Sequence, residues 1–93
     1  MAVTITQVRM APGGTTHEHI TDYGWTNDAD GKVDSSDKPT MVAWMDKEGG
    51  KAHCGSGVNR VEVGTVHPSI GEAYLRTFAD GDWTNNLLSL PRF

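Results

Sequence analysis

The chain has only one cysteine and no long hydrophobic run, and these two features restrict the kinds of protein that it can be. Its one cysteine, Cys54, cannot form a disulfide within the chain, which fits a reducing cytoplasm. No apolar run approaches the roughly 18 residues that a membrane-spanning helix needs. The N-terminal stretch MAVTITQVRM also lacks the basic and apolar regions of a signal peptide. We therefore expect a cytoplasmic protein without a membrane span.

Clustered basic residues and catalytic motifs are absent as well. The 8 Lys and Arg residues are scattered, no two are adjacent, and the net charge is −4. Non-specific binding to nucleic acid needs many cationic contacts with phosphates, so this class of partner is disfavoured. The glycines lack the spacing of a phosphate-binding loop, and His53 and Cys54, as neighbours on a strand, point to opposite faces. We expect no enzymatic activity and no cofactor.

Residues 35–50, SSDKPTMVAWMDKEGG, are the one segment with a clean helical pattern. Ser36 or Asp37 can cap the N-terminus, and Pro39 fits a first turn, where backbone N–H groups have no helical partner. Gly49 and Gly50 supply a left-handed stop. A stripe at helical spacing, predicted to face a sheet, contains Met41, Trp44, Met45 and Glu48.

Most of the remaining chain predicts strands and turns. The expected strands are residues 3–10, 17–26, 51–55, 58–67 and 73–79, with a brief return at 32–34 after the Asp30-Gly31 turn. The first strand changes its apolar face after Thr6, which indicates either a bulge or a strand exposed to water on both faces. The order is β-β-α-β-β-β. The sequence thus predicts one compact α+β domain over residues 1–93, with an antiparallel sheet of about five strands packed on one central helix.

Several blocks of the chain resemble a known family. They are ITQVRM at 5–10, HEHI at 17–20, MVAWM at 41–45, and YLRTFADG at 74–81 followed by Trp83, Asn86-Leu87-Leu88 and Leu90-Pro91. Together they resemble the small bacterial and phage proteins of domain of unknown function 3892. The resemblance covers nearly the whole chain and implies a compact stand-alone domain, often encoded by phages. It implies no characterised activity, so it assigns no site residue.

An acidic loop has the spacing of a calcium-binding loop. With Thr26 at the first position, carboxylates fall at the third, fifth, ninth and twelfth positions, with Gly31 at the sixth. The candidate ligands are Asp28, Asp30, Asp34 and Asp37. Against calcium, Thr26 replaces the usual Asp and a strand precedes the loop. The alternative is an Asp-Gly hairpin with solvated carboxylates. The histidines could bind zinc, but paired Cys-x-x-Cys spacing is absent.

Aromatic residues on the strands are the candidates for a protein interface. One helix cannot cover both faces of the predicted sheet, so aromatics on the other face would be exposed or covered by a partner. With Ile20 buried, the alternation of the second strand turns Tyr23 and Trp25 outward. The opposite registration, with both aromatics in the core and Ile20 outside, stays open. The predicted interface residues are His17, His19, Tyr23, Trp25, Tyr74 and Phe78.

These patterns favour a non-enzymatic protein-interaction domain that binds a host or cellular protein and, if phage-encoded, modulates it. A calcium- or zinc-binding module is the alternative, and a small hydrolase or a nucleic-acid binder comes last. The leucine-rich segment 85–91 is expected to dock on its own domain. Its alternative partner is a second subunit, which would make the protein a homo-oligomer, or another protein.

Overall fold

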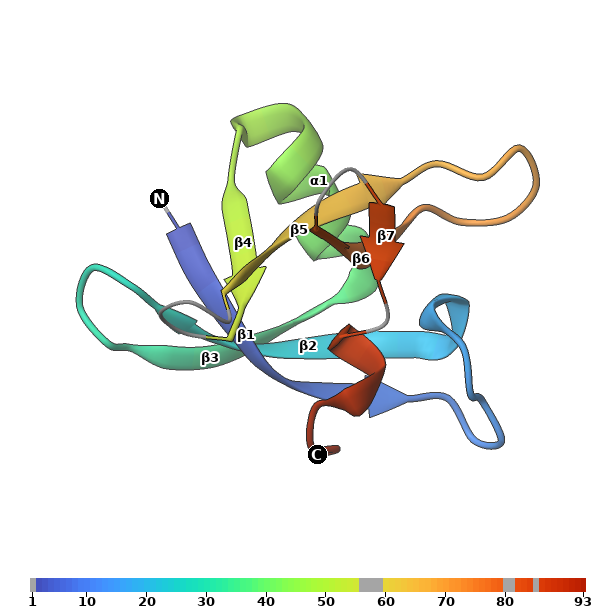
Figure 1. The fold of residues 1–93 in the computed structure, drawn as a ribbon, viewed down its shortest axis with the longest axis horizontal. Coiled ribbons are helices and arrows are strands. Elements are labelled where there is room, and N and C mark those ends of the chain that lie inside the picture. Colours follow the sequence, from blue (N-terminus) through green and yellow to red (C-terminus); the bar gives the residue numbers. More distant parts are fainter. Residues whose placement is uncertain (1, 56–59, 80–81, 85) are drawn as a thin grey trace.

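The computed structural model describes residues 2–55, 60–79, 82–84 and 86–93, which form seven strands, one α-helix and short 3-10 helices (Figure 1). In chain order these are β1 (Ala2–Met10), η1 (His17–His19), β2 (Ile20–Asn27), β3 (Val33–Asp37), α1 (Lys38–Glu48), β4 (Lys51–Cys54), β5 (Val61–Val66), β6 (Tyr74–Ala79), β7 (Asp82–Thr84) and η3 (Asn86–Ser89). The predicted α+β class with one helix is therefore confirmed.

The described strands form one mixed sheet in the order β3-β2-β1-β4-β5-β6-β7. Every neighbouring pair is antiparallel except β1 and β4, which run in parallel with Val3 beside Ala52. The prediction of about five antiparallel strands in the order β-β-α-β-β-β is thus wrong in detail. A third strand precedes α1, and β7 follows β6. The parallel pair arises because α1 carries the chain from β3 back across the sheet, as a crossover connection does.

The strand boundaries around β2 and β3 also differ from those predicted. Residues 17–19, expected to begin a strand, form the 3-10 helix η1, and β2 begins at Ile20. β3 continues to Asp37, beyond the predicted stretch 32–34, because its residues stay paired with β2. The turn at Gly31 between them is confirmed: Gly31 has φ 73° and its N–H donates to the Asn27 carbonyl at 2.8 Å. Residues 58–59 of the predicted strand 58–67 lie outside the described part of the chain.

The capping residues place α1 where the sequence predicted a helix. Asp37 is the N-cap, and its carboxylate accepts a hydrogen bond from the Thr40 N–H at 2.9 Å. Pro39 lies in the first turn, where its missing N–H leaves no helical hydrogen bond unmade. Gly49 ends the helix with φ 69°, a left-handed conformation that costs other residues about 1 kcal/mol or more.

The predicted bulge in the first strand is confirmed. The register of β1 against β2 shifts between Ile5 and Gln7, so Thr6 has no direct partner in β2. Ile5 and Val8 consequently both point into the core, although an unbroken strand would turn residues three apart to opposite faces. This shift explains why the apolar face of β1 changes along its length.

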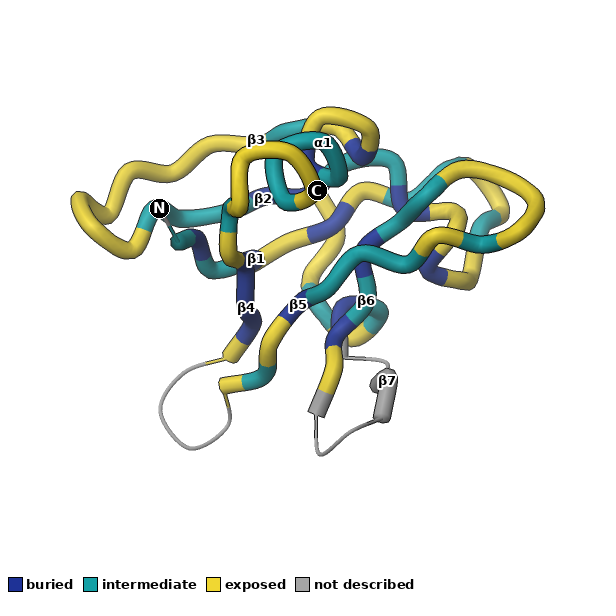
Figure 2. The backbone as a smooth tube through the Cα atoms, turned by 90° about the horizontal axis from the view of Figure 1, so that it is seen from above, coloured by how far each residue is buried: buried dark blue, intermediate teal, exposed yellow. Residues whose placement is uncertain are grey.

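The sheet curls around α1, and the core lies on its concave side. α1 contacts β2 and β3 at one end of the sheet and β5 and β6 towards the other. The Tyr23 hydroxyl on β2 accepts a hydrogen bond from the Leu75 N–H on β6 at 3.3 Å, although three strands separate β2 from β6. Buried positions, dark blue in Figure 2, follow β1, β4, β5 and β6, while the connecting loops are largely exposed. The curl allows one helix to cover most of one sheet face.

The C-terminal segment docks on its own domain, as predicted. Leu87 in η3 is 0% exposed and belongs to the core. Beyond it, the Val8 N–H donates to the Pro91 carbonyl at 3.0 Å and the Phe93 N–H donates to the Val8 carbonyl at 3.2 Å. Arg9 places its guanidinium 4.6 Å from the centre of the Phe93 ring. The C-terminal residues thus pair with a part of β1 that lies beyond its pairing with β4, and Leu87 adds to the core.

Candidate functional site

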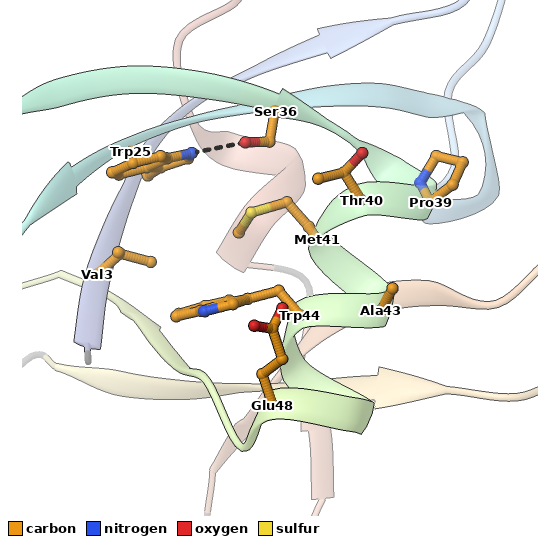
Figure 3. Close-up of a pocket in the computed structure, with 9 residues that line it drawn as sticks. All are labelled: Val3, Trp25, Ser36, Pro39, Thr40, Met41, Ala43, Trp44 and Glu48. Carbon is orange, nitrogen blue, oxygen red and sulfur yellow. Dashed lines mark hydrogen bonds between the residues drawn. The ribbon is translucent and has the colours of Figure 1, made fainter.

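A groove lies between α1 and strands β1–β3, and its surface is mainly apolar. It has a volume of about 530 Å³ and is lined by Val3, Trp25, Ser36, Pro39, Thr40, Met41, Ala43, Trp44 and Glu48. In Figure 3 the two indole rings are both seen nearly edge-on, as opposite walls, with Val3 and Met41 at the level between them. Glu48 is the only charged lining residue, one helical turn beyond Trp44. The groove therefore combines aromatic walls with a single carboxylate.

Both indole walls are held in place by the protein. The Trp25 Nε1–H donates to the Ser36 hydroxyl on the neighbouring strand at 3.2 Å, which fixes the plane of that ring (Figure 3). The Trp44 ring lies so close to Gly50 that a Cβ at this position would overlap the indole. Gly50 thus leaves room for the ring immediately after the helix ends. A partner entering the groove would meet side chains whose rotamers are already restricted, which lowers the entropy cost of binding.

The sequence identified the helical stripe that contains Met41, Trp44 and Glu48, but it did not reveal the groove. Met41 is buried at 3% exposure and belongs to the core, as the helical spacing predicted. Trp44 only packs against the edge of that core and stays half-buried, and Glu48 is exposed at the end of the stripe. Glu48 is the one charged residue of an otherwise apolar stripe. This is the sequence signal that this end of the stripe lies at the exposed rim of the groove.

The outward placement predicted for Tyr23 is wrong. Its side chain is 0% exposed, and its hydroxyl bridges to β6 through Leu75. Burial raises the pKa of the Tyr23 hydroxyl to about 12, and the hydrogen bond from Leu75 opposes this rise in part. The alternative registration was right for Tyr23 but wrong for Ile20, which is also 0% exposed. Ile20 begins β2 beside a second register shift in β1, so simple alternation does not hold there.

The other predicted interface residues occupy different parts of the surface. His17 is 6% exposed, and its ring stacks on Tyr74 with 6.4 Å between the ring centres. Burial, together with the nearby Arg76 guanidinium, lowers the pKa of His17. His19 is exposed in η1, where its Nδ1 contacts the Thr16 hydroxyl at 3.1 Å.

On β6, Leu75 and Thr77 are fully buried, so Tyr74 and Phe78, which alternate with them along the strand, lie on the other face of the sheet. Phe78 is 38% exposed on the convex side of the sheet. Trp25, by contrast, lines the groove on the concave side. The six residues predicted for one interface therefore do not share a face, and Trp25 alone belongs to the groove.

The four aspartates of the predicted calcium loop are engaged separately. Asp30 accepts a hydrogen bond from the Lys32 N–H at 2.9 Å, and Asp34 accepts one from the Ser35 N–H at 2.8 Å. Asp37 caps α1, and its hydrogen bonds with the Thr40 hydroxyl and N–H lower its pKa. Asp28 turns towards Thr4 and His53. Across the described residues, no three His, Cys, Asp or Glu side chains are grouped as metal ligands.

A polar cluster that the sequence did not reveal surrounds His53 on the convex side. Arginine only donates hydrogen bonds, so the 3.0 Å contact from Arg60 makes Nδ1 of His53 the acceptor and places the hydrogen on Nε2. That Nε2 lies 2.8 Å from the Thr4 hydroxyl and 3.1 Å from the Asp28 carboxylate. The Thr4 hydroxyl donates to Asp28 at 2.7 Å. The parallel pairing of Thr4 with His53 assembles this cluster, and no local spacing reports it.

This cluster is not arranged like a catalytic triad. In a triad, the imidazole accepts the proton of the nucleophilic hydroxyl and a carboxylate holds the other ring nitrogen. Here the Thr4 hydroxyl donates to Asp28, and both contact the same nitrogen of His53. Cys54 faces the core side of β4, and burial raises the pKa of its thiol, which keeps it in the less reactive form.

The fold and the groove define a small α+β domain with a curled mixed sheet and a preformed apolar groove with two tryptophan walls. The chain belongs to the family described as protein of unknown function (DUF3892), whose model matches residues 4–91. Neither the curated proteins nor the solved structures contain a match to the chain. Within the described residues, no helix is long and apolar enough to cross a membrane.

Proposed function

We propose that this domain is a non-catalytic protein-interaction module that docks on a host or cellular protein through the groove between α1 and β1–β3. The observation that carries the proposal is the pair of restrained indoles, Trp25 and Trp44, which line an open groove instead of filling the core. Tryptophan is enriched among the residues that contribute most to protein interfaces, because it offers a large rigid surface with a polar edge. Apolar concave surfaces of this kind are typical of binding sites.

A protein partner suits this groove better than a nucleic acid. The net charge of −4 and the carboxylate of Glu48 in the lining both repel phosphates. An interface needs a buried apolar centre with a polar rim, and Met41 at the base of the groove with Ser36 and Glu48 around it supplies these parts. We place the encounter in the cytoplasm, where a phage-encoded protein would meet its host partner.

The test compares affinity capture by two variants that carry the same type of substitution. Ala43→Lys introduces a long cationic side chain at a position of α1 that lines the groove and also a neighbouring hollow beside Ala73. Ala29→Lys is the matched control, because Ala29 is exposed in the β2–β3 turn and does not belong to the core cluster. Both variants are first checked for an unchanged melting curve.

We expect the unmodified protein and Ala29→Lys to recover the same partner from cells, and Ala43→Lys to recover much less of it. Mass spectrometry with quantification of each recovered protein measures this difference. Equal recovery by a folded Ala43→Lys variant would show that the groove is not the docking site.

A further inference from the structure

The charge that lines the groove is negative only. Among its nine lining residues Glu48 alone is charged, and no described residue forms an ion pair with it. Asp34 pairs directly with Trp25 across β2 and β3, so it extends from the same face of the sheet at the outer side of this wall. No lysine or arginine belongs to the lining. The groove therefore presents negative charge beside apolar walls, with no internal cation to balance it.

The walls themselves favour a cation. The face of an indole carries the negative part of the ring's quadrupole and attracts cations, most strongly when water is excluded. Gly50 supports the Trp44 ring from one side, and the bond to Ser36 uses the N–H edge of Trp25, so both rings keep fixed orientations. In Figure 3 the two rings lie on opposite sides of the groove, with the Glu48 carboxylate beside the Trp44 wall.

We propose that the groove binds an arginine side chain of the partner protein, with its guanidinium between the indoles of Trp25 and Trp44 and ion-paired with Glu48. This inference rests on the proposed docking function and names the chemistry of the partner. A guanidinium is planar, stacks on aromatic rings and is more weakly hydrated than an ammonium, so it enters an apolar slot at a lower desolvation cost than lysine. Its fork of N–H donors also matches a carboxylate.

A planar nucleobase is the main competing occupant, because bases also stack on aromatic side chains. Every nucleotide brings a phosphate, however, and Glu48 and Asp34 would repel it on either side of the groove. The carboxylates therefore favour a guanidinium over a nucleotide, and the test below includes a nucleotide.

The experiment follows the indole N–H signals of the whole protein in ¹⁵N–¹H NMR spectra during titration with small probes. The probes are acetyl-Gly-Arg-Gly-amide, its lysine and citrulline counterparts, and adenosine monophosphate. Citrulline has the shape of arginine without the charge. Substitution of each tryptophan by phenylalanine assigns the signals. We expect the arginine peptide to shift the Trp25 and Trp44 signals in the millimolar range, the lysine peptide to bind more weakly, and citrulline and the nucleotide to cause no shift.

Glu48→Gln should weaken binding of the arginine peptide roughly twofold to fivefold, as expected for loss of an exposed ion pair. Glu48 is exposed, so this variant should fold normally. Glu62→Gln, an exposed substitution on β5 outside the groove, is the matched control and should bind like the unmodified protein. A Glu48→Gln variant that binds as tightly as Glu62→Gln would overturn the inference.

Equal shifts with the arginine and citrulline peptides, or a shift with the nucleotide alone, would also overturn it. The proposed docking function can be refuted independently of the arginine assignment. If Ala43→Lys loses the cellular partner while the arginine peptide shifts neither indole signal, docking through the groove stands and the arginine assignment is wrong. If the peptide binds but Ala43→Lys recovers every partner, the docking function is wrong.

Discussion

Replacing Tyr23 with phenylalanine tests whether the core depends on the bridge between β2 and β6. Tyr23 is fully buried, and its hydroxyl accepts a hydrogen bond from the Leu75 N–H. β7 pairs only with the far end of β6, from Thr77 to Ala79, so it does not reach Leu75. In the variant this buried N–H loses its acceptor, and an unsatisfied buried donor costs about 1–3 kcal/mol. A loss of this size is substantial for a small domain with a total stability of about 5–15 kcal/mol.

The same substitution has a signature at high pH. The pKa of Tyr23 rises from 10.0 to about 12 on folding, so the unfolded chain loses its phenolic proton at a lower pH than the folded protein does. Ionisation of Tyr23 therefore does not affect the free energy of unfolding below pH 10, and it lowers this free energy as the pH rises from 10 to about 12. One pKa unit corresponds to about 1.4 kcal/mol, so roughly 2–3 kcal/mol is lost across this window. Tyr23→Phe lacks this contribution.

Urea unfolding at pH 7 and at several values from pH 9 to about 12 measures both effects. Tyr74→Phe is the matched control, because Tyr74 is the second of two tyrosines and is only half-buried. We expect Tyr23→Phe to be less stable at neutral pH and less sensitive to alkali than the control. A neutral-pH stability within about 0.5 kcal/mol of the unmodified protein, with the alkaline slope retained, would refute the bridge.

Three further predictions concern other parts of the molecule. Because burial lowers the pKa of His17 below its value of 6.5 in the unfolded chain, the unmodified protein should lose stability as the pH falls through 6.5, and His17→Phe should flatten this dependence in melts at different pH. Gly50→Ala should lower the free energy of unfolding by about 1–3 kcal/mol through overlap with Trp44, whereas a change near zero in urea melts would contradict this packing. Millimolar calcium should leave the melting temperature unchanged, because the loop carboxylates are engaged separately, and a rise of several degrees would contradict it.

The parts of the fold that depend on local chemistry were predictable from the sequence. The cap at Asp37, the first-turn Pro39 and the stop at Gly49 act within a few residues of the helix ends, so the sequence places α1 closely. The turn at Gly31 and the bulge after Thr6 are likewise local. In each case, the residue type restricts the backbone or the pattern changes within one strand.

The sheet order and the site depend on contacts between distant residues. The pairing of Val3 with Ala52 joins segments about fifty residues apart, and no local pattern specifies that it is parallel. Residues 17–19 continue the alternation of β2, yet they form η1, so the pattern placed His17 and His19 on a strand face that does not exist. Whether Trp44 would be covered or exposed depended on the curl of the sheet, which sequence spacing does not report.

The curl also separates the residues that stabilise the domain from those available to a partner. Tyr23 and Trp25 lie two positions apart on β2, and their environments differ because β6 closes over Tyr23 but not over Trp25. Trp25 therefore needs Ser36 to fix its ring, whereas Tyr23 is fixed by the core itself. On α1, Ala43 is half-buried and Glu48 is exposed, and neither residue belongs to the core cluster. Substitutions there should change binding without unfolding the protein, which is what allows the docking function to be tested independently of stability.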